Sequence, residues 1–376
     1  MFFFILGNHP ELSKAEIQSK FNQLKIKTEI IAESDEFLIL KFNQEIDHAF
    51  LIKQLAGTIK IGKIISEIKQ ATAENLIKFI PEKEKMVFGI SPYGLNLNID
   101  KLGLTIKKTL KQNGHRARFV TSKESPLSSV IVQKELLNKG IELVIIKTND
   151  KIFIGETLCV QPFELFSHID FGRPNRDSFS GMLPLKLAQL MINLSGLNLT
   201  GTLLDPFCGS GTILQQALFI GYKNIIGTDA SKKAISDSEQ NLIWFQNQFG
   251  INVTVPLHQL SAANISSIIK SSSIDAIVTE PWLGPALKGS ERPAEIQSII
   301  RQVEDLYSSS LNSLEKVLKP TGVMVIVVPE FFIRGTSYKT EIEGYFEKHF
   351  EQTGHWVYAR DDQMVVRHIY RLRKNG

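Results

Sequence analysis

The sequence predicts an α/β protein in which a mostly parallel, doubly wound C-terminal sheet follows smaller α/β domains. From residue 186 onwards, short apolar segments alternate with segments of helical spacing, as in successive β-α-β units. A Gly-rich turn follows the first of these strands. The 376 residues suffice for two or three domains, and 43% apolar and 22% charged residues are ordinary for a globular protein.

Residues 1–60 are predicted to form a small α/β domain. The apolar run Phe2–Leu6 is typical of a strand, and the apolar spacing within Glu11–Phe21 indicates a helix. A second strand and a second helix are expected at Phe37–Phe42 and Asp47–Ala56.

Residues 61–165 are predicted to form a second α/β domain. Helices are expected at Asp100–Asn113, with Leu104, Ile106 and Leu110 inward, and at Ser128–Asn138. Strands are expected at Met86–Ile90 and Arg116–Val120, and as a hairpin at Glu142–Lys147 and Lys151–Thr157.

Residues 166–185 mix Gly, Pro, Ser and charge without a period, which predicts a linker loop before the C-terminal domain, residues 186–376. The strands of that domain are expected at Gly201–Leu204, Asn224–Thr228, Asn252–Val255, Asp275–Thr279 and Gly322–Val328. Two closing strands, Val357–Ala359 and Val365–Leu372, are expected to be antiparallel.

Two features of the sequence indicate the cellular environment of the protein. Cys159 and Cys208 give neither a disulfide framework nor metal-ligand spacing, which favours a reducing cytoplasm and no bound metal. The N-terminus lacks the basic start and longer apolar core of a signal peptide, and no apolar run approaches the roughly 20 residues that span a bilayer. We therefore expect a soluble, cytoplasmic protein.

The Gly-rich turn predicts a cofactor site. It reads Asp205-Pro206-Phe207-Cys208-Gly209-Ser210-Gly211-Thr212 between a strand and a helix. Gly209 and Gly211 allow a tight turn and a close ligand, and the next helix offers free backbone N–H groups. Asp229, about twenty residues later, ends the second strand, where an acid can bind two ribose hydroxyls.

A nicotinamide dinucleotide is the rival ligand for such a turn. The spacing is not G-x-G-x-x-G, and Asp205 would place an anion where the phosphates sit. The cationic sulfonium and amino acid tail of S-adenosylmethionine fit better.

The residues after the expected fourth strand of the C-terminal sheet predict the chemistry. Glu280-Pro281-Trp282 has the acid-Pro-aromatic order that amino methyltransferases place there. Acceptor oxygens on Glu280 and on the carbonyls of Glu280 and Pro281 would orient a weakly nucleophilic amine, and Glu280 could take a proton. Trp282 would stack on a flipped base. By itself, this triplet could equally be a strand end followed by a Pro-rich turn.

Together these residues resemble the THUMP-domain tRNA guanine N2-methyltransferases, which modify position 10 of tRNA in archaea and eukaryotes. The most specific stretch is Phe171-Gly172-Arg173-Pro174-Asn175-Arg176-Asp177 with Gly181-Met182-Leu183-Pro184, which is similar to the family's linker. The cofactor turn matches closely. The opening residues 3–17 are similar to the family's N-terminal ferredoxin-like domain, and residues 61–165 then correspond to its THUMP domain, which holds the tRNA acceptor end.

The resemblance implies a class I methyltransferase fold for the C-terminal domain, tRNA as partner and S-adenosylmethionine as cofactor. Pro184 would pack near the active site. The implied cofactor residues are Asp205, Phe207, Cys208, Gly209, Gly211, Thr212, Asp229, Ala230 and Ser231. Residues 101–140 hold nine Lys or Arg and two Glu on a chain of net charge +4. Their candidate phosphate contacts are Lys107, Lys108, Lys111, Arg116 and Arg118, with a solvated helix face as the alternative.

Two departures from the family pattern concern the target atom. Established members carry Asp-Pro-Pro-Tyr where this chain has Glu280-Pro281-Trp282-Leu283. An Asp usually follows the third strand to accept from the adenine amino group, and Ser261 is its candidate replacement here.

The sequence therefore predicts methylation of a guanine N2 in tRNA. The alternatives are a DNA amino methyltransferase and a tRNA-binding protein whose methyltransferase site has decayed. Eukaryotic relatives work with a small zinc-binding activator subunit, and such a subunit is a candidate partner.

Overall fold

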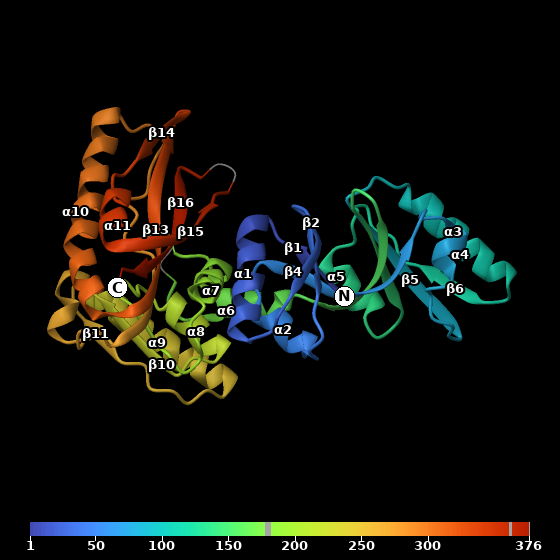
Figure 1. Cartoon of the computed structure of the whole chain (residues 1–376), viewed down its shortest axis with the longest axis horizontal. Helices are drawn as coiled ribbons and strands as arrows, with labels where there is room; N and C mark the ends of the chain where they lie inside the picture. Colours follow the sequence, from blue (N-terminus) through green and yellow to red (C-terminus); the bar gives the residue numbers. More distant parts are fainter. Residues whose placement is uncertain (177–181, 361–362, 376) are drawn as a thin grey trace. The chain divides into compact units, whose positions relative to one another are not determined.

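The chain folds into two compact units in a computed structural model that describes residues 1–176, 182–360 and 363–375 (Figure 1). One unit comprises Met1–Ile17 and Lys25–Pro162, and the other comprises Gln18–Leu24 and Phe163–Gly376. Within the described residues, each unit is built on one sheet of eight strands. No helix in these residues is long and apolar enough to cross a membrane.

The sheet of the N-terminal unit has the strand order β2-β3-β1-β4-β8-β7-β5-β6. Its strands are β1 (Phe2–Leu6), β2 (Glu29–Glu33), β3 (Phe37–Lys41), β4 (Thr58–Ile68), β5 (Lys85–Tyr93), β6 (Arg116–Phe119), β7 (Ile141–Lys147) and β8 (Ile152–Val160). Residues 1–162 also form the helices α1 (Pro10–Gln23), α2 (His48–Gln54), α3 (Ala73–Ile77), α4 (Ile99–Gln112), α5 (Ser129–Ile131) and the π-helix η1 (Val132–Leu136).

Most of the predicted N-terminal elements are confirmed, including the antiparallel hairpin of β7 and β8. The predicted domain boundary after residue 60 falls inside β4, which pairs with β1 on one side and β8 on the other. The subdivision of this unit stays a prediction. The inward direction predicted for Leu104 on α4 is wrong, because its side chain is 58% exposed while Ile106 and Leu110 are buried. Positions 104 and 106 lie on nearly opposite sides of a helix of 3.6 residues per turn.

The sheet of the C-terminal unit has the order β11-β10-β9-β12-β13-β16-β15, with β14 paired to β13. Its strands are β9 (Thr202–Asp205), β10 (Asn224–Asp229), β11 (Leu257–Gln259), β12 (Ile274–Thr279), β13 (Leu318–Ile333), β14 (Thr336–Lys339), β15 (Phe350–Tyr358) and β16 (Val365–Lys374). The strands from β11 to β13 are parallel, and β16 runs antiparallel to both neighbours. The predicted doubly wound sheet with an antiparallel last strand is confirmed.

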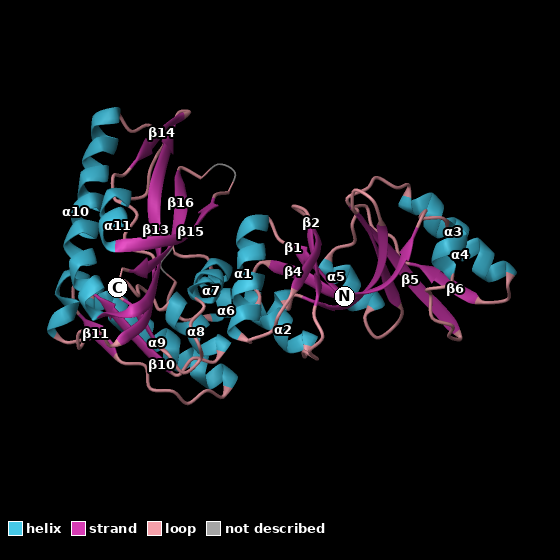
Figure 2. Ribbon diagram, in the orientation of Figure 1, coloured by secondary structure: helices cyan, strands magenta, loops and turns pink. Residues whose placement is uncertain are grey.

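Helices cover both faces of this sheet (Figure 2). They are α6 (Phe163–Gly172), α7 (Leu185–Ser195), α8 (Thr212–Ile220), α9 (Lys232–Phe249), the 3-10 helix η2 (Ala262–Ser267), α10 (Pro293–Val317) and α11 (Glu343–His349). The main core packs α10 and η2 against β12, β13 and β16. Apolar side chains on both faces of the parallel strands explain their continuous hydrophobic runs in the sequence.

Two predicted segments differ from the structure. Residues 166–172 of the expected loop belong to α6, because Phe166 and Ile169, three positions apart, share one buried helix face. The third strand lies at Leu257–Gln259 and not at Asn252–Val255. The Val253 N–H donates to the Gln246 side chain of α9 at 3.0 Å, so a neighbouring strand does not use it.

Candidate active site

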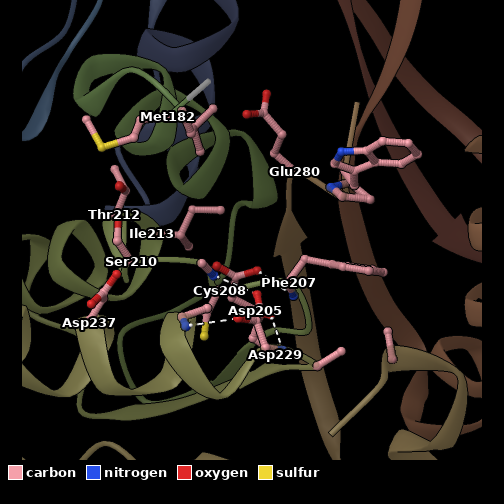
Figure 3. Close-up of a pocket in the computed structure, with 18 of the residues that line it drawn as sticks. Met182, Asp205, Phe207, Cys208, Ser210, Thr212, Ile213, Asp229, Asp237 and Glu280 are labelled. Atoms are coloured by element: carbon pink, nitrogen blue, oxygen red, sulfur yellow. Dashed lines mark hydrogen bonds between the residues drawn. The ribbon is translucent and has the colours of Figure 1, made fainter. Parts of the chain in front are cut away.

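A cavity of about 460 Å³ lies at the carboxyl ends of β9, β10 and β12 (Figure 3). At this edge the strand order reverses, because β10 and β12 flank β9 on opposite sides. Open α/β sheets bind their ligands at such a switch point. Most of the predicted catalytic and cofactor residues line this cavity: Asp205, Phe207, Cys208, Gly209, Thr212, Asp229, Ala230, Ser231, Ser261, Glu280, Pro281 and Trp282.

Two predicted residues, Pro184 and Gly211, are not among those that line the cavity. Pro184 caps the start of α7, directly after Met182 and Leu183, which do line it. Gly211 caps the start of α8 with a φ of +85°, and an added Cβ would lie 3.0 Å from the Ser238 Oγ. Both residues therefore shape the segments that carry the lining side chains.

The Gly-rich turn is held against the end of β10 by Asp229. One carboxylate oxygen accepts from the Gly209 N–H at 3.0 Å, and the other accepts from the Ser231 N–H at 2.9 Å. A carboxylate has about four lone-pair sites, so two remain for outside donors such as ribose hydroxyls. Gly209 has a φ of +50°, and nothing lies within 4 Å of a Cβ built on it, which leaves open space at the bend of the turn.

Asp205 is a buried carboxyl whose resolved partners are neutral. Its Oδ1 accepts from the Thr279 hydroxyl at 2.8 Å and from the Phe207 N–H at 3.2 Å. Burial raises the pKa of Asp205 to about 7, and the nearby charges of Asp229 and Glu280 act in the same direction. A cation beside Asp205 would relieve this cost, so the residue suits a ligand with an ammonium group.

Cys208 and Ser261 contribute to the walls of the cavity. Burial raises the pKa of the Cys208 thiol well above its usual range, so this residue packs as an unreactive side chain. Ser261 follows β11 and caps η2, where its Oγ accepts from the Ala263 N–H at 3.4 Å. That contact leaves the hydroxyl able to donate to a ligand.

The family-like segment before α7 is anchored to the cofactor turn. Arg173 is buried and donates to the Thr212 Oγ1 at 2.8 Å and to Asp170 at 2.9 Å. Asn241 of α9 donates to the carbonyl oxygens of both Asn175 and Ser210. The described part of this segment thus holds the turn in place, while residues 177–181 of the predicted linker lie outside the described residues.

Glu280 follows β12 and pairs with Arg367 of β16. The Arg367 Nε donates to the Glu280 Oε2 at 2.6 Å, and Nη2 lies 3.4 Å from Oε1. Both side chains are less than 10% exposed. Burial raises the pKa of Glu280, and the charge and hydrogen bond of Arg367 oppose that rise. In Figure 3 the Glu280 carboxylate points away from Asp205 and Asp229 at the other end of the cavity.

The two residues after Glu280 complete this end of the cavity. Pro281 is buried, whereas the Trp282 side chain is 40% exposed. An indole that lines a cavity and still reaches solvent offers an apolar surface on which a planar ring can stack.

Sequence reasoning missed several residues of this site. Arg367 is the most consequential, and no motif marks it, because it lies 87 positions from Glu280. Arg173 belongs to the family-like segment Phe171–Asp177, but the sequence alone assigns no role to its side chain. The cavity is also lined by Met182, Leu183, Ser210, Ile213, Lys233, Ala234, Asp237, Ala262, Leu283 and Leu306.

The candidate phosphate contacts belong to the N-terminal unit. Lys107, Lys108 and Lys111 lie on α4, with Lys108 and Lys111 exposed and Lys107 half-buried. Arg116 and Arg118 lie on β6, where Arg118 pairs with Glu135 at 2.7 Å and Arg116 lies 3.7 Å from Glu84. Because its guanidinium already has a carboxylate partner, Arg118 is a weaker candidate than the lysines of α4.

Comparison with known proteins identifies the C-terminal unit. The family model of the RMKL-like methyltransferase domain matches residues 173–332. The tRNA (guanine(10)-N2)-dimethyltransferase of Methanothermobacter thermautotrophicus is 27% identical over 185 residues, which is 49% of either chain. The enzyme of the same name from Methanocaldococcus jannaschii is 28% identical over 64% of this chain and 59% of its own length. The chain thus matches about half the length of these two relatives.

A third relative is matched over more of its length. The protein of Methanothermococcus thermolithotrophicus named a probable tRNA (guanine(10)-N2)-dimethyltransferase is 31% identical over 145 residues, which cover 37% of this chain and 77% of the relative. Among solved structures, TrmN from Thermus thermophilus aligns over the full length of both chains with a TM-score of 0.58 and 14% identity. That similarity supports the fold of the whole chain.

Proposed function

Because the chain belongs to the family of the tRNA guanine N2-methyltransferases, we propose that it methylates N2 of a guanine in tRNA, at position 10, with S-adenosylmethionine as donor. The observation that carries this proposal is the pair of contrasting ends of one cavity. Asp205 and Asp229 lie at one end, and Glu280, the first residue of the acid-Pro-aromatic segment, lies at the other (Figure 3).

The residues at the first end fit the cofactor. Asp205, a buried carboxyl with neutral partners, would take the ammonium of the methionine part. Asp229 would accept from the ribose hydroxyls with its remaining lone pairs. Ser261 would lie on the adenine side, and the open bend at Gly209 would admit the ligand close to the backbone.

The residues at the second end fit an amino group on a flipped base. Trp282 would stack on the base, while Glu280 and the Pro281 carbonyl would accept from its N–H groups. These contacts would turn the amino lone pair towards the methyl group and replace the water around it. Glu280 or a water molecule would then receive the proton that the nitrogen releases.

S-adenosylmethionine, held by Asp205 and Asp229, would supply a methyl group on a sulfonium, and the electron pair of the broken S–C bond would stay on sulfur when the amine nitrogen takes the methyl group.

The N-terminal unit would bind the tRNA through the basic residues of α4, and the cytoplasm is the compartment in which we place this activity. A small activator subunit stays a candidate partner.

The test is a methyl-transfer assay with the purified chain and isotope-labelled S-adenosylmethionine. Unmodified tRNA transcripts are offered alongside duplex DNA, and the products are analysed by nucleoside mass spectrometry. We expect N2-methylguanosine or N2,N2-dimethylguanosine from tRNA and no product from DNA. Transfer to DNA alone would indicate a DNA amino methyltransferase. Cofactor binding without transfer to any nucleic acid would indicate a decayed site.

A further inference from the structure

The Glu280–Arg367 pair is built asymmetrically. The Glu280 Oε2 is held by the Arg367 Nε at 2.6 Å, whereas Oε1 is 3.4 Å from Nη2. Arg367 is itself buried, and it is not among the residues that line the cavity, whereas Glu280 is. The arginine therefore fixes the carboxylate from behind and leaves most of the capacity of Oε1 to a group inside the cavity.

The titratable groups that the described residues place around Glu280 come from three elements. Arg367 on β16 is the cation that contacts it. Asp205 at the end of β9 and Tyr307 on α10 both feel the Glu280 charge. The Tyr307 hydroxyl donates to the Val327 carbonyl at 2.6 Å and so is already engaged. Burial raises the pKa of Glu280, and within the described part of the chain Arg367 alone lowers it, so loss of Arg367 would favour the protonated acid.

The protonation state of this acid decides which base edge it matches. An ionised carboxylate only accepts hydrogen bonds, whereas a protonated one offers a donor next to an acceptor. The Watson–Crick edge of guanine presents two adjacent donors, N1–H and the N2 amino group. Adenine presents a donor, the N6 amino group, beside the N1 acceptor. The ionised form therefore complements guanine, and the protonated form complements adenine.

We propose that Arg367 is a positioning residue that holds Glu280 as a fixed carboxylate and thereby selects guanine over adenine as the methyl acceptor. This inference rests on the proposed function. It also explains how a Glu can stand where established family members carry Asp. The longer side chain reaches β16, and the arginine there restores a single orientation.

The experiment compares wild type with Arg367→Gln, Arg367→Lys and a matched control, Arg371→Gln. Arg371 lies on the same strand and is half-buried, but it donates to the Leu194 carbonyl and Thr353 and not to Glu280. Single-turnover transfer to tRNA is followed from pH 5.5 to 8.5 at S-adenosylmethionine concentrations that saturate the chain at every pH, and S-adenosylmethionine affinity is measured alongside. After the wild-type product has been mapped, a transcript with adenine at the target position measures base selection.

We expect Arg367→Gln to move the acid limb of the guanine pH–rate profile upward by about 1–3 pH units, the usual effect of losing an adjacent opposite charge. The ratio of guanine to adenine transfer should fall at the same time, while cofactor affinity stays within about twofold, since the cofactor end is untouched. Arg367→Lys should recover part of the shift. Arg371→Gln should change the stability of the chain but leave the profile in place.

If Arg367→Gln does not fold, Glu280→Gln tests the same inference. This isosteric amide cannot ionise, so at saturating S-adenosylmethionine guanine transfer should fall and show no acid limb in the accessible range. Two results would overturn the inference: equal losses of transfer rate at every pH for Arg367→Gln and Arg371→Gln, or an unchanged guanine-to-adenine ratio in both Arg367→Gln and Glu280→Gln. In either case, transfer to guanine by the wild type would still uphold the proposed function. A wild-type chain that binds cofactor but methylates no tRNA would overturn both.

Discussion

Two buried carboxyl groups lie at the ends of adjacent parallel strands, and they differ in what surrounds them. Asp205, at the end of β9, has a hydroxyl and a backbone N–H as partners, and burial raises its pKa to about 7. Glu280, just after β12, has the guanidinium of Arg367. Among the described residues no cation contacts the first acid, whereas the second is paired with one.

This difference separates what each end of the cavity can bind. A carboxyl with only neutral partners gains most from a positively charged ligand, as the ammonium of S-adenosylmethionine would be. A carboxylate already paired with arginine gains little from another cation, but it still accepts from neutral N–H donors such as a base amino group. The two ends should therefore respond differently to substitution and to pH.

The largest expected effect is that of Glu280→Ala on chemistry. Single-turnover methyl transfer should fall by about 100-fold or more, because the amine loses the group that orients it. S-adenosylmethionine affinity should stay within about twofold. Glu351→Ala, which removes an exposed partner of Arg373, is the matched control and should leave transfer unchanged. Unchanged turnover in Glu280→Ala would remove the role assigned to this residue.

Asp205→Asn should have the opposite signature. Its cofactor affinity should fall by about 10- to 100-fold, because a hydrogen bond to a charged group is worth about 1.5–3 kcal/mol. Isothermal titration calorimetry at pH 7.5 measures this. At saturating cofactor the transfer rate should recover most of its wild-type value. A variant that binds normally but transfers poorly would mean that the two ends are not separable.

The effect of pH on cofactor binding to the wild type should be smaller than the effect of Asp205→Asn, but it reports directly on the protonation of Asp205. Between pH 5.5 and 7, affinity should rise with pH by up to about tenfold per unit, because Asp205 must lose its proton to face a cation. Titrations in buffers of different ionisation enthalpy should show proton release on binding. Asp205→Asn should show neither effect, and a wild-type affinity that is flat across this window would contradict the assignment.

The Asp205 carboxyl should also make the free energy of unfolding depend on pH. An unfolded aspartate ionises near 3.8, whereas folded Asp205 keeps its proton up to about pH 7. In that window the folded chain binds more protons than the unfolded chain, so the contribution of Asp205 to the free energy of unfolding falls as pH rises. Urea unfolding of the ligand-free wild type and of Asp205→Asn would isolate this contribution.

Substitutions in the N-terminal unit should have the smallest effect on cofactor binding and methyl transfer. Lys107→Glu with Lys108→Glu should weaken tRNA binding and reduce the slope of its salt dependence, since these cations would contact phosphates. Cofactor affinity and the transfer rate on saturating tRNA should not change. A matched pair of reversals at Lys25 and Lys27, outside α4, should leave the slope as it is in wild type. An unaltered slope in the α4 variant would return these lysines to a solvated helix face.

The sequence determined the cofactor end of the site by itself. Asp205 and Thr212 are joined by a single turn, and Asp229 closes the next strand, so their juxtaposition follows from the β-α-β order alone. The same local logic predicted the parallel strands, the antiparallel last strand and the position of Glu280. It failed where local composition misleads, as for residues 166–172, whose buried face on α6 is hidden among Gly, Pro and charge.

Only the tertiary structure decided what Glu280 is paired with. Arg367 lies 87 positions away in the sequence. It reaches Glu280 because β16 runs antiparallel to β13, and β13 is the neighbour of β12, the strand that Glu280 follows. The pairing register sets Arg367 opposite Pro329 on one face of the sheet and His368 on the other. A shift of one residue would turn the guanidinium away from Glu280, because side chains alternate along a strand. The charge state of the predicted catalytic acid is therefore a property of strand register, which no short motif encodes.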